Sequence, residues 1–430
     1  MTDVTDKIFI DFMQMRSFSK NPLIFTRGEG IYLIDDKGRR YVDGLSGIFV
    51  NSIGHGNAAV IEAMTQQLHR VAFTPPLLGT NDAALRLTKQ LLEIGPPGVS
   101  AVKLLSTGAE ATEAAMKLAR QYFKQTGKPG KYKILSHYGS YHGATLGALA
   151  ASGGKDRKSI FEPLGGGFIH FHPPFLRRWD SSLVQDETVF VELINRTIEA
   201  EDPDTIAAVI VEPICVNSSG FMVPPQNYLR RLKDVCEKHN ILLILDEIIT
   251  GFGRVGTMFA SEHFGVVPDM TCCAKGMSSG YAALSAVLIN ETVAGAFYGD
   301  EEDLVQFRSS GTFGGNPVSA AAGEAVISEL LRKGIVENSR TVGAHLRSRL
   351  EELASEFSVI TDVRGVGLLQ GVEYSRGRVG SAIAKEAIAR GLLLRVSDDF
   401  TVFAPPLIIT KEEIDDTVEL FRDVLRTVSK

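Results

Sequence analysis

The sequence predicts an α/β fold, with a large domain built on a mostly parallel sheet and a smaller α+β domain. Short, nearly continuous apolar runs alternate with amphipathic stretches over about residues 49–290, as in strands buried on both faces of a parallel sheet. After Pro317 the pattern changes to long helices with short strands between them. We therefore expect a large domain at 51–316 and a small domain at 317–430, which the N-terminal segment 1–50 completes.

In the large domain, the expected strands are aliphatic and end abruptly. They are Val102–Leu105, Lys133–Leu135, Ala207–Val211, Ile241–Leu245, Met270–Cys273 and Ala283–Ile289. The helices between them include Glu110–Lys124 and Tyr228–His239. Strands that alternate with helices in this way indicate a mostly parallel sheet.

In the small domain, helices dominate. We expect helices at Ser319–Arg332 and Gly380–Arg390, and strands near Ser358–Val363, near Gly367–Glu373 and on both sides of Asp398–Asp399. The last helix has the clearest signals, because Thr410 and Glu413 have the spacing of a capping box. Its apolar residues recur on one face, at Ile414, Val418, Phe421 and Leu425.

Composition narrows the functional classes. The 430 residues carry a net charge of −6, with no basic block, so neither a nucleic acid nor an anionic membrane is an expected partner. The four cysteines form no C-x-x-C pair, which favours a reduced compartment and provides no metal-ligand spacing. No signal peptide and no apolar run of about 18 residues is visible. We expect a cytoplasmic, metal-independent protein.

Two acids follow the apolar run that ends at Leu245, namely Asp246 and Glu247. Ligands of parallel α/β sheets gather at the carboxyl ends of strands, so a carboxylate here could hold a cation, a metal or a protonated ring nitrogen. The alternative is structural: one of the two acids caps the helix that follows.

A lysine, Lys275, follows the next apolar run, Met270–Cys273. Burying an ammonium group there is costly, and desolvation favours the neutral amine, which is the species that forms Schiff bases. The alternative is an exposed surface charge. The chain between Asp246 and Lys275 has room for a strand–helix–strand unit, which would bring both side chains to one edge of the sheet.

A possible phosphate site comes earlier, where a strand runs through Ser106 and Thr107 into Gly108, Ala109 and an alanine-rich helix. Free N–H groups and the positive end of the helix dipole suit a phosphate, and glycine permits close approach. The alternative is a plain turn in which Thr107 caps the helix.

Together, these segments resemble a known family. The ordered motifs are STGAEATEAAMKLAR, SYHGAT, VEPI, LDEIITGFGR, PDMTCCAKG, GTFGGNP and RGVGLLQGVE. They look like those of a class III aminotransferase of the fold-type I pyridoxal-phosphate (PLP) superfamily, and the similarity spans about residues 25–425.

The resemblance implies roles for the strand-end residues. Lys275 would hold PLP as a Schiff base and move a proton during the reaction, and Asp246 would pair with the ring nitrogen of PLP. Gly108 and Ala109 match the turn that binds the phosphate. The family often has serine where Ala109 stands, so only backbone N–H groups would bind the phosphate there.

Further contacts to PLP are implied by the same resemblance. Tyr141 and Ile248 match residues that pack on the two faces of the ring, although ordinary core packing is the alternative for both. Glu212 matches an acid near the cofactor. Thr312 matches a threonine that reaches the phosphate of the neighbouring subunit, which implies a homodimer with a shared active site, or a tetramer built from it.

Departures from related subgroups bear on the substrate. Many 4-aminobutyrate and ornithine enzymes have a glutamine where Ile249 stands, and a second acid after the Glu-Pro-Ile run, which is absent after Glu212. Arg395 matches an arginine that binds the substrate carboxylate in amine:pyruvate (omega) transaminases, with a solvated surface arginine as the alternative. Phe49, Leu77 and Leu78 occupy positions where that subgroup often has aromatic pocket residues.

The expected function is transfer of an amino group from an amine or omega-amino acid to a keto acid such as pyruvate. Related PLP reactions share the lysine and the aspartate, so an aminomutase, an epimerase or a dialkylglycine-type decarboxylase is the alternative. A non-catalytic cofactor-binding protein is a third possibility, which the joint presence of Lys275, Asp246 and Thr312 argues against.

Overall fold

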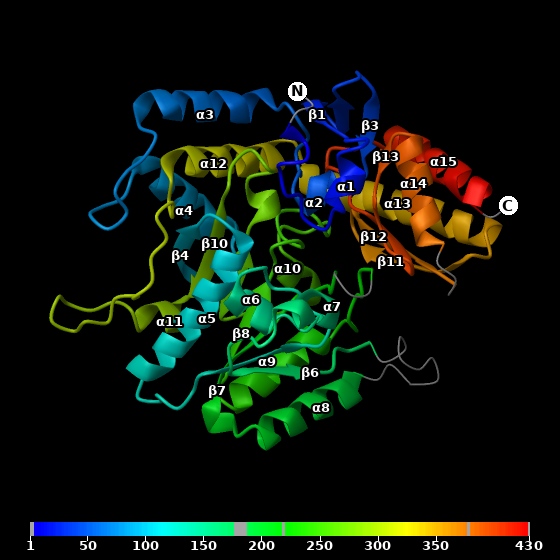
Figure 1. Ribbon diagram of the computed structural model, residues 1–430. Coiled ribbons are helices and arrows are strands. Elements are labelled where there is room, and N and C mark those ends of the chain that lie inside the picture. Colours follow the sequence, from blue (N-terminus) through cyan, green and yellow to red (C-terminus); the bar gives the residue numbers. More distant parts are fainter. Residues whose placement is uncertain (1–3, 176–186, 217–219, 376–378, 429–430) are drawn as a thin grey trace.

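The computed structural model describes residues 4–175, 187–216, 220–375 and 379–428 (Figure 1). Its largest element is a seven-stranded sheet in the order β4-β10-β9-β8-β7-β5-β6. The strands are β4 (Val99–Leu105), β5 (Lys133–His137), β6 (Phe168–Phe171), β7 (Ile206–Val211), β8 (Leu242–Asp246), β9 (Met270–Cys273) and β10 (Ser285–Asn290). In the described residues, no helix combines the length and apolar character needed to cross a membrane.

The sheet is mostly parallel, as predicted, with β10 as the exception. The pairs β5–β6, β5–β7, β7–β8 and β8–β9 are parallel, whereas β10 runs antiparallel to both β4 and β9. Only a short connection, which includes the 3₁₀ turn Lys275–Met277, joins β9 to β10. A parallel neighbour would need a crossover of a dozen or more residues, so the chain reverses instead.

Helices cover both faces of this sheet (Figure 1). Helix α5 (Gly108–Gln125) packs on β7, β9 and β10, and α9 (Tyr228–Lys238) packs on β8 and on α8 (Glu187–Ala200). Near the β4 edge, α12 (Pro317–Arg332) packs across α3 (Ala58–Arg70) and α4 (Asp82–Ile94). The shorter helices of this part are α6 (Leu146–Ala151), α7 (Lys155–Lys158), α10 (Ala260–Phe264) and α11 (Glu291–Gly295).

Two four-stranded sheets form the rest of the described structure, in the orders β1-β2-β3-β13 and β11-β12-β15-β14. The strands are β1 (Phe25–Glu29), β2 (Tyr32–Asp35), β3 (Arg40–Asp43), β11 (Ile360–Val366), β12 (Leu369–Tyr374), β13 (Leu392–Leu393), β14 (Arg395–Val396) and β15 (Phe400–Phe403). The helices are α1 (Met15–Phe18), α2 (Ser46–Phe49), α13 (Ile335–Glu356), α14 (Gly380–Ala389) and α15 (Lys411–Val428). The exact domain limits stay a prediction.

The two ends of the chain meet in the β1-β2-β3-β13 sheet. Strand β13 pairs in parallel with β3, with Leu392 opposite Val42. Residues that precede position 50 therefore share a sheet with the C-terminal part of the chain. The C-terminal helix also has the predicted cap: Thr410 N–H donates to Glu413 at 2.9 Å, and Glu413 N–H donates back to the Thr410 hydroxyl at 3.2 Å.

Candidate active site

A cavity of about 340 Å³ opens at the carboxyl ends of β8 and β9, beside the first turn of α5. Seven residues singled out in the sequence line it together. They are Gly108, Ala109, Tyr141, Glu212, Asp246, Ile248 and Lys275. Residues from widely separated parts of the chain thus converge on one space at the edge of the sheet where ligands of α/β folds bind.

The pairing of β8 with β9 brings Asp246 and Lys275 to this edge. Asp246 is the last residue of β8 and lies opposite Cys272 of β9. Lys275 follows β9 and opens the 3₁₀ turn with a backbone φ of 43°. This left-handed conformation is uncommon for a residue other than glycine and often marks a functional position.

The amine of Lys275 is buried, and both negative and positive side chains lie close enough to affect its pKa. Burial lowers the pKa of Lys275 to about 8, while the negative charges of Asp246 and Glu212 oppose this shift and Arg395 adds to it. No hydrogen bond or ion pair to another described residue holds its Nζ atom. At pH 7 the neutral fraction of this amine is therefore about 10%, far above that of a lysine with the ordinary pKa of 10.5.

The carboxylate of Asp246 is oriented by a residue that the sequence analysis missed, His142. Its Nδ1 atom lies 2.8 Å from Oδ2 of Asp246, and the N–H of Ile248 donates to Oδ1 at 3.2 Å. His142 is fully buried, and its Nε2 has no hydrogen-bond partner among the described residues. Its place between Tyr141 and Gly143, in a motif already recognised, was the available signal.

The second acid, Glu247, has a structural role. Its carboxylate accepts hydrogen bonds from the N–H groups of Ala260 at 2.6 Å and Ser261 at 2.8 Å, at the start of α10. The hydroxyl of Thr250 donates to it at 3.0 Å. The capping alternative therefore applies to Glu247, and Asp246 is the acid that faces the cavity.

The start of α5 combines a cap with two available donors. Thr107 and Glu110 form a capping box, so the structural alternative for Thr107 is correct. Even so, the backbone N–H groups of Gly108 and Ala109 donate to no acceptor in the described residues. A Cβ added at Gly108 would lie 2.9 Å from Cδ1 of Ile248, so glycine keeps this corner open. The turn fits an anionic group such as a phosphate.

Glu212, which directly follows β7, also lines the cavity and is linked to Tyr141, whose N–H donates to Oε2 of Glu212 at 3.1 Å. Burial raises the pKa of Glu212 to about 7, and the nearby charge of Asp246 raises it further, against the opposing effect of His142. This carboxyl group can therefore take up or release a proton near neutral pH.

Other predicted site residues lie away from the cavity within this chain. Phe49 is buried and packs edge-on against Phe221, with ring centroids 5.9 Å apart. Leu77 and Leu78 are 80% and 88% exposed, and Thr312 is also exposed. Their proposed roles stay predictions, and that of Thr312 concerns a neighbouring subunit. Arg395 lines a second cavity next to the first.

This arrangement defines a class of protein. A lysine and an aspartate at neighbouring strand ends, beside a helix start that can hold a phosphate, match what PLP needs. The fold is that of fold-type I PLP transaminases. The aminotransferase class-III family model matches residues 14–425, so the chain belongs to the class III aminotransferases and uses PLP.

Known proteins resemble the chain over nearly its whole length. A probable aminotransferase of Mycobacterium tuberculosis is 36% identical, over 98% of this chain and 93% of that protein. Among solved structures, a thermostable (S)-enantioselective omega-transaminase from Thermomicrobium roseum has a TM-score of 0.93 at 34% identity, covering 98% and 96% of the two chains. An amine transaminase from an uncultivated Pseudomonas species, in its PLP-bound form, has a TM-score of 0.92 at 30% identity, covering 98% and 99%.

Proposed function

We propose that this aminotransferase moves an amino group from an amine or omega-amino acid to a keto acid such as pyruvate, with PLP bound covalently to Lys275. One observation carries the proposal: Lys275 and Asp246 extend from adjacent parallel strands into one cavity, and burial lowers the pKa of the lysine to about 8. The similarity to an omega-transaminase and to an amine transaminase supports the choice of substrates.

In this proposal, Lys275 has two tasks. Its neutral amine would hold the cofactor covalently, and the same amine would accept the proton from the substrate carbon that carries the amino group. The low pKa supports both tasks, since only the neutral amine can attack a carbonyl or accept a proton.

Asp246 holds a proton on the ring nitrogen of PLP. Bound PLP acts as an electron sink, which makes the proton on the neighbouring substrate carbon removable. The carboxylate must stay negative and correctly oriented for this role, and the contacts from His142 at 2.8 Å and from the Ile248 N–H at 3.2 Å support that orientation.

The rest of the site follows the resemblance. Gly108 and Ala109 would hold the phosphate through their N–H groups, and Tyr141 and Ile248 would pack against the ring. Thr312 of one subunit completes the phosphate site of the other in a homodimer. Two exposed aromatic side chains support such an interface: Phe313, which follows Thr312 in the sequence, and Phe73, whose ring centroid lies 5.9 Å from that of Phe313. Leu77 and Leu78 are exposed as well.

Arg395 selects for carboxylates. A guanidinium group can hold a keto-acid carboxylate through two parallel hydrogen bonds. Arg395 is only partly buried and lies at the start of β14, close enough to influence the pKa of Lys275. It can therefore serve the acid substrate from the edge of the cavity.

The decisive experiment locates the cofactor. The holoenzyme is reduced with borohydride and digested, and the label is expected on the peptide that contains Lys275. An omega-amino acid donor added without acceptor should convert the bound PLP to its aminated form, which is followed by absorbance. Lys275→Ala should lower turnover by roughly 10²–10⁴-fold or more, because the covalent link and the proton carrier are both lost.

Lys103→Ala is the matched control, because Lys103 is a desolvated lysine outside the cavity. A label on any lysine other than Lys275 would refute the assignment of that residue. A holoenzyme that no amino donor converts would refute the transamination proposed here.

A further inference from the structure

A cavity of about 500 Å³ lies between the second half of α5 and the segment 304–309. It shares no lining residue with the reaction cavity at Lys275. Four of its nine lining residues are cations and none is an acid. The cations are Lys117, Arg120 and Lys124 of α5 and Arg308 of the facing segment. The cavity is therefore a positively charged site that the proposed transamination does not use.

No acid among the described residues forms an ion pair with these four cations. Lys117 Nζ donates instead to the hydroxyl of Ser309 at 2.8 Å, and Nε of Arg120 donates to the carbonyl oxygen of Tyr132 at 2.8 Å. The guanidinium carbon of Arg120 also lies 5.4 Å from the centre of the Phe168 ring. Nη2 of Arg120 is buried and has no hydrogen-bond partner in the described parts of the chain.

The acids that come closest to these cations in the sequence are engaged elsewhere. Glu113, one turn before the first of the cations, accepts a hydrogen bond from the hydroxyl of Thr145. Asp303, which precedes the segment 304–309, accepts one from the N–H of Asp300 at 2.7 Å. The positive charges around the cavity therefore have no carboxylate partner within the described structure.

Helix stability does not explain this arrangement. A cation in the last turn of a helix interacts favourably with the helix dipole, which accounts for Lys124. Lys117 and Arg120 lie earlier in the 18-residue helix, and like charges three or four residues apart on one face are destabilising. Arg308 comes from a different segment. A cleft lined by charges of one sign attracts ligands of the opposite sign, so the arrangement suits an anion.

Two glutamines of α5 hold the facing segment in place. Nε2 of Gln121 donates to the carbonyl oxygen of Gln306 at 2.9 Å, and its Oε1 accepts from the N–H of Arg308 at 3.1 Å. Nε2 of Gln125 donates to the carbonyl oxygen of Val305 at 3.2 Å. The cavity is therefore formed before any ligand binds, and binding does not have to order this segment.

The charge and the size of the cavity indicate the class of ligand. Phosphate oxygens accept hydrogen bonds from both lysine and arginine, and a chain of phosphates carries several negative charges at neighbouring positions. A single carboxylate would neutralise only one of the four cations. A volume of about 500 Å³ lies in the range of small-molecule sites, and Leu304 and Phe307 add an apolar wall.

We propose that this cavity binds a small molecule with two or three linked phosphate groups, which its four cations hold. An inorganic oligophosphate and a nucleotide share this chemistry. The proposal goes beyond transamination at Lys275 and does not depend on it.

The test is titration calorimetry of the holoenzyme, in which PLP already fills the reaction cavity, in a buffer without magnesium. Tripolyphosphate and ATP should both bind, whereas adenosine, which has no phosphate, should not. Lys124→Gln and Arg308→Gln should each weaken the binding of tripolyphosphate roughly 10- to 100-fold, because each removes a charge-assisted hydrogen bond.

A comparison of the two ligands distinguishes the sources of phosphate. Tighter binding of ATP than of tripolyphosphate, with the difference lost in Leu304→Ser, identifies a nucleotide site, because the apolar wall then contributes. Equal binding of both ligands, with no effect of Leu304→Ser, identifies a site for inorganic oligophosphate.

Lys128→Gln is the matched control, because Lys128 is an exposed cation just after α5 that does not line the cavity. This variant removes the same charge and should leave the Kd for tripolyphosphate within about twofold of the parent value, since exposed charges that do not contact the ligand are screened by salt.

Several outcomes would overturn the proposal. Absence of binding at about 1 mM tripolyphosphate, or unchanged binding in both Lys124→Gln and Arg308→Gln, would exclude the site. Equal weakening in Lys128→Gln would indicate only a general attraction between charges, and equal binding of adenosine would exclude phosphate recognition. A change of oligomeric state in Lys124→Gln or Arg308→Gln, measured by sedimentation, would make these cations a contact between subunits. Conversion of PLP by an amino donor measures the proposed transamination separately.

Discussion

Two adjacent acidic residues, Asp246 and Glu247, have different roles in this protein. Asp246 ends β8 facing the cavity, and its carboxylate contacts His142. Glu247 is fully buried and anchors the start of α10 through two backbone N–H groups. Successive side chains at a strand end point in opposite directions, so Asp246 points into the cavity and Glu247 points toward the start of α10.

Asp246→Asn should separate the two roles. The variant should still bind PLP, but its half-reaction with an amino donor should slow by roughly 10²–10⁴-fold, because the ring nitrogen is no longer held protonated. Stopped-flow absorbance of the holoenzyme measures this rate. Glu247→Gln is the control, which should lower thermal stability more than it changes the rate. A near-normal rate in Asp246→Asn would assign the role to another group.

The pKa of Lys275 predicts how covalent capture of PLP depends on pH. Burial lowers this pKa from 10.5 to about 8, so the neutral amine predominates above pH 8 in the folded enzyme. The rate at which apoenzyme captures PLP should rise with pH up to about 8 and then level off. Capture by a short lysine peptide should keep rising to higher pH. A parallel rise for both would contradict a desolvated Lys275.

Arg395→Ala should discriminate between substrates that carry a carboxylate and those that do not. The apparent KM for pyruvate should rise by an amount equivalent to about 2–5 kcal/mol, as expected when one member of a hydrogen-bonded charge pair is removed. An amine without a carboxylate should keep most of its half-reaction rate. Equal losses for both kinds of substrate would indicate a structural role, and no change for either would place Arg395 outside the site.

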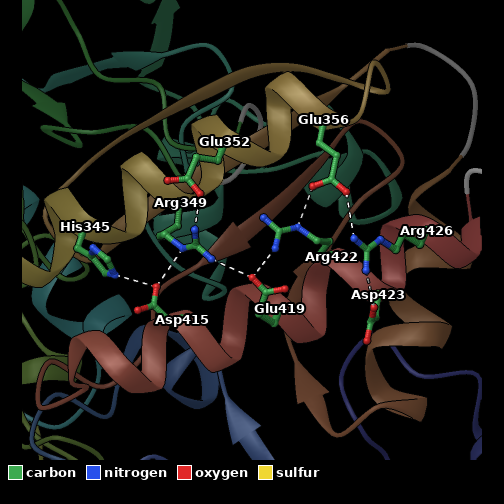
Figure 2. A network of polar contacts seen from close by, with 9 residues as sticks. All are labelled: His345, Arg349, Glu352, Glu356, Asp415, Glu419, Arg422, Asp423 and Arg426. Atoms are coloured by element: carbon green, nitrogen blue, oxygen red, sulfur yellow. Dashed lines mark hydrogen bonds and ion pairs between the residues drawn. The ribbon is translucent and has the colours of Figure 1, made fainter.

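At the scale of elements, α13 and α15 are joined by a network of ion pairs (Figure 2). Arg349 of α13 contacts Asp415 at 2.9 Å and Glu419 at 2.8 Å on α15. About two turns further along α13, Glu356 contacts Arg422 at 2.8 Å. Acidic and basic side chains thus face one another along the outer edge of the contact between α13 and α15. The inner edge of this contact is apolar, and together the two edges orient α15 against the small sheets.

Arg349→Met tests how much this network contributes. Because Arg349 pairs with three acids and is mostly buried, its loss should lower the free energy of unfolding by about 1 kcal/mol, the upper range for such pairs. The difference should shrink at high salt, since exposed members are screened. Urea unfolding at two salt concentrations measures both effects. Arg196→Met, which removes one exposed pair on α8, should change nothing measurable.

At the scale of the whole molecule, one buried arginine connects three regions of the chain. Arg254 donates to the carbonyl oxygens of Leu368 at 3.1 Å and Pro405 at 2.6 Å, and to the hydroxyl of Ser46 at 3.2 Å. Burial lowers the pKa of Arg254 to about 9, while the charge of Asp43 opposes this shift. The N-terminal segment, the large sheet region and the C-terminal region therefore meet at a single guanidinium group.

Arg254→Met should destabilise the whole molecule. It leaves buried acceptors without donors, which costs about 3 kcal/mol in the free energy of unfolding. Differential scanning calorimetry of the holoenzyme and urea unfolding of the apoenzyme measure the loss. Arg254→Lys keeps a charge but cannot reach all three acceptors. Its stability should therefore lie between that of the parent enzyme and that of Arg254→Met. Unchanged stability in Arg254→Met would show that the regions are held together by other contacts.

Local patterns in the chain are sufficient to predict most elements of this fold and the centre of its site. Strand Met270–Cys273 and the cap of the last helix were predicted residue by residue, since apolar runs and capping pairs are short-range signals. The pairing of Asp246 with Lys275 at one edge also followed, because neighbouring parallel strands align their carboxyl ends.

Contacts between distant residues required the folded chain. The sequence does not indicate that β10 runs antiparallel, that His142 rather than a neighbour holds Asp246, or that Arg157 lies over Tyr141 within the same cavity as Arg395. Without the family resemblance, the residue pattern also leaves open which of Asp246 and Glu247 faces the cavity. Each of these depends on how elements that are distant in the sequence pair or pack, and a one-dimensional pattern records the period of an element but not its partner.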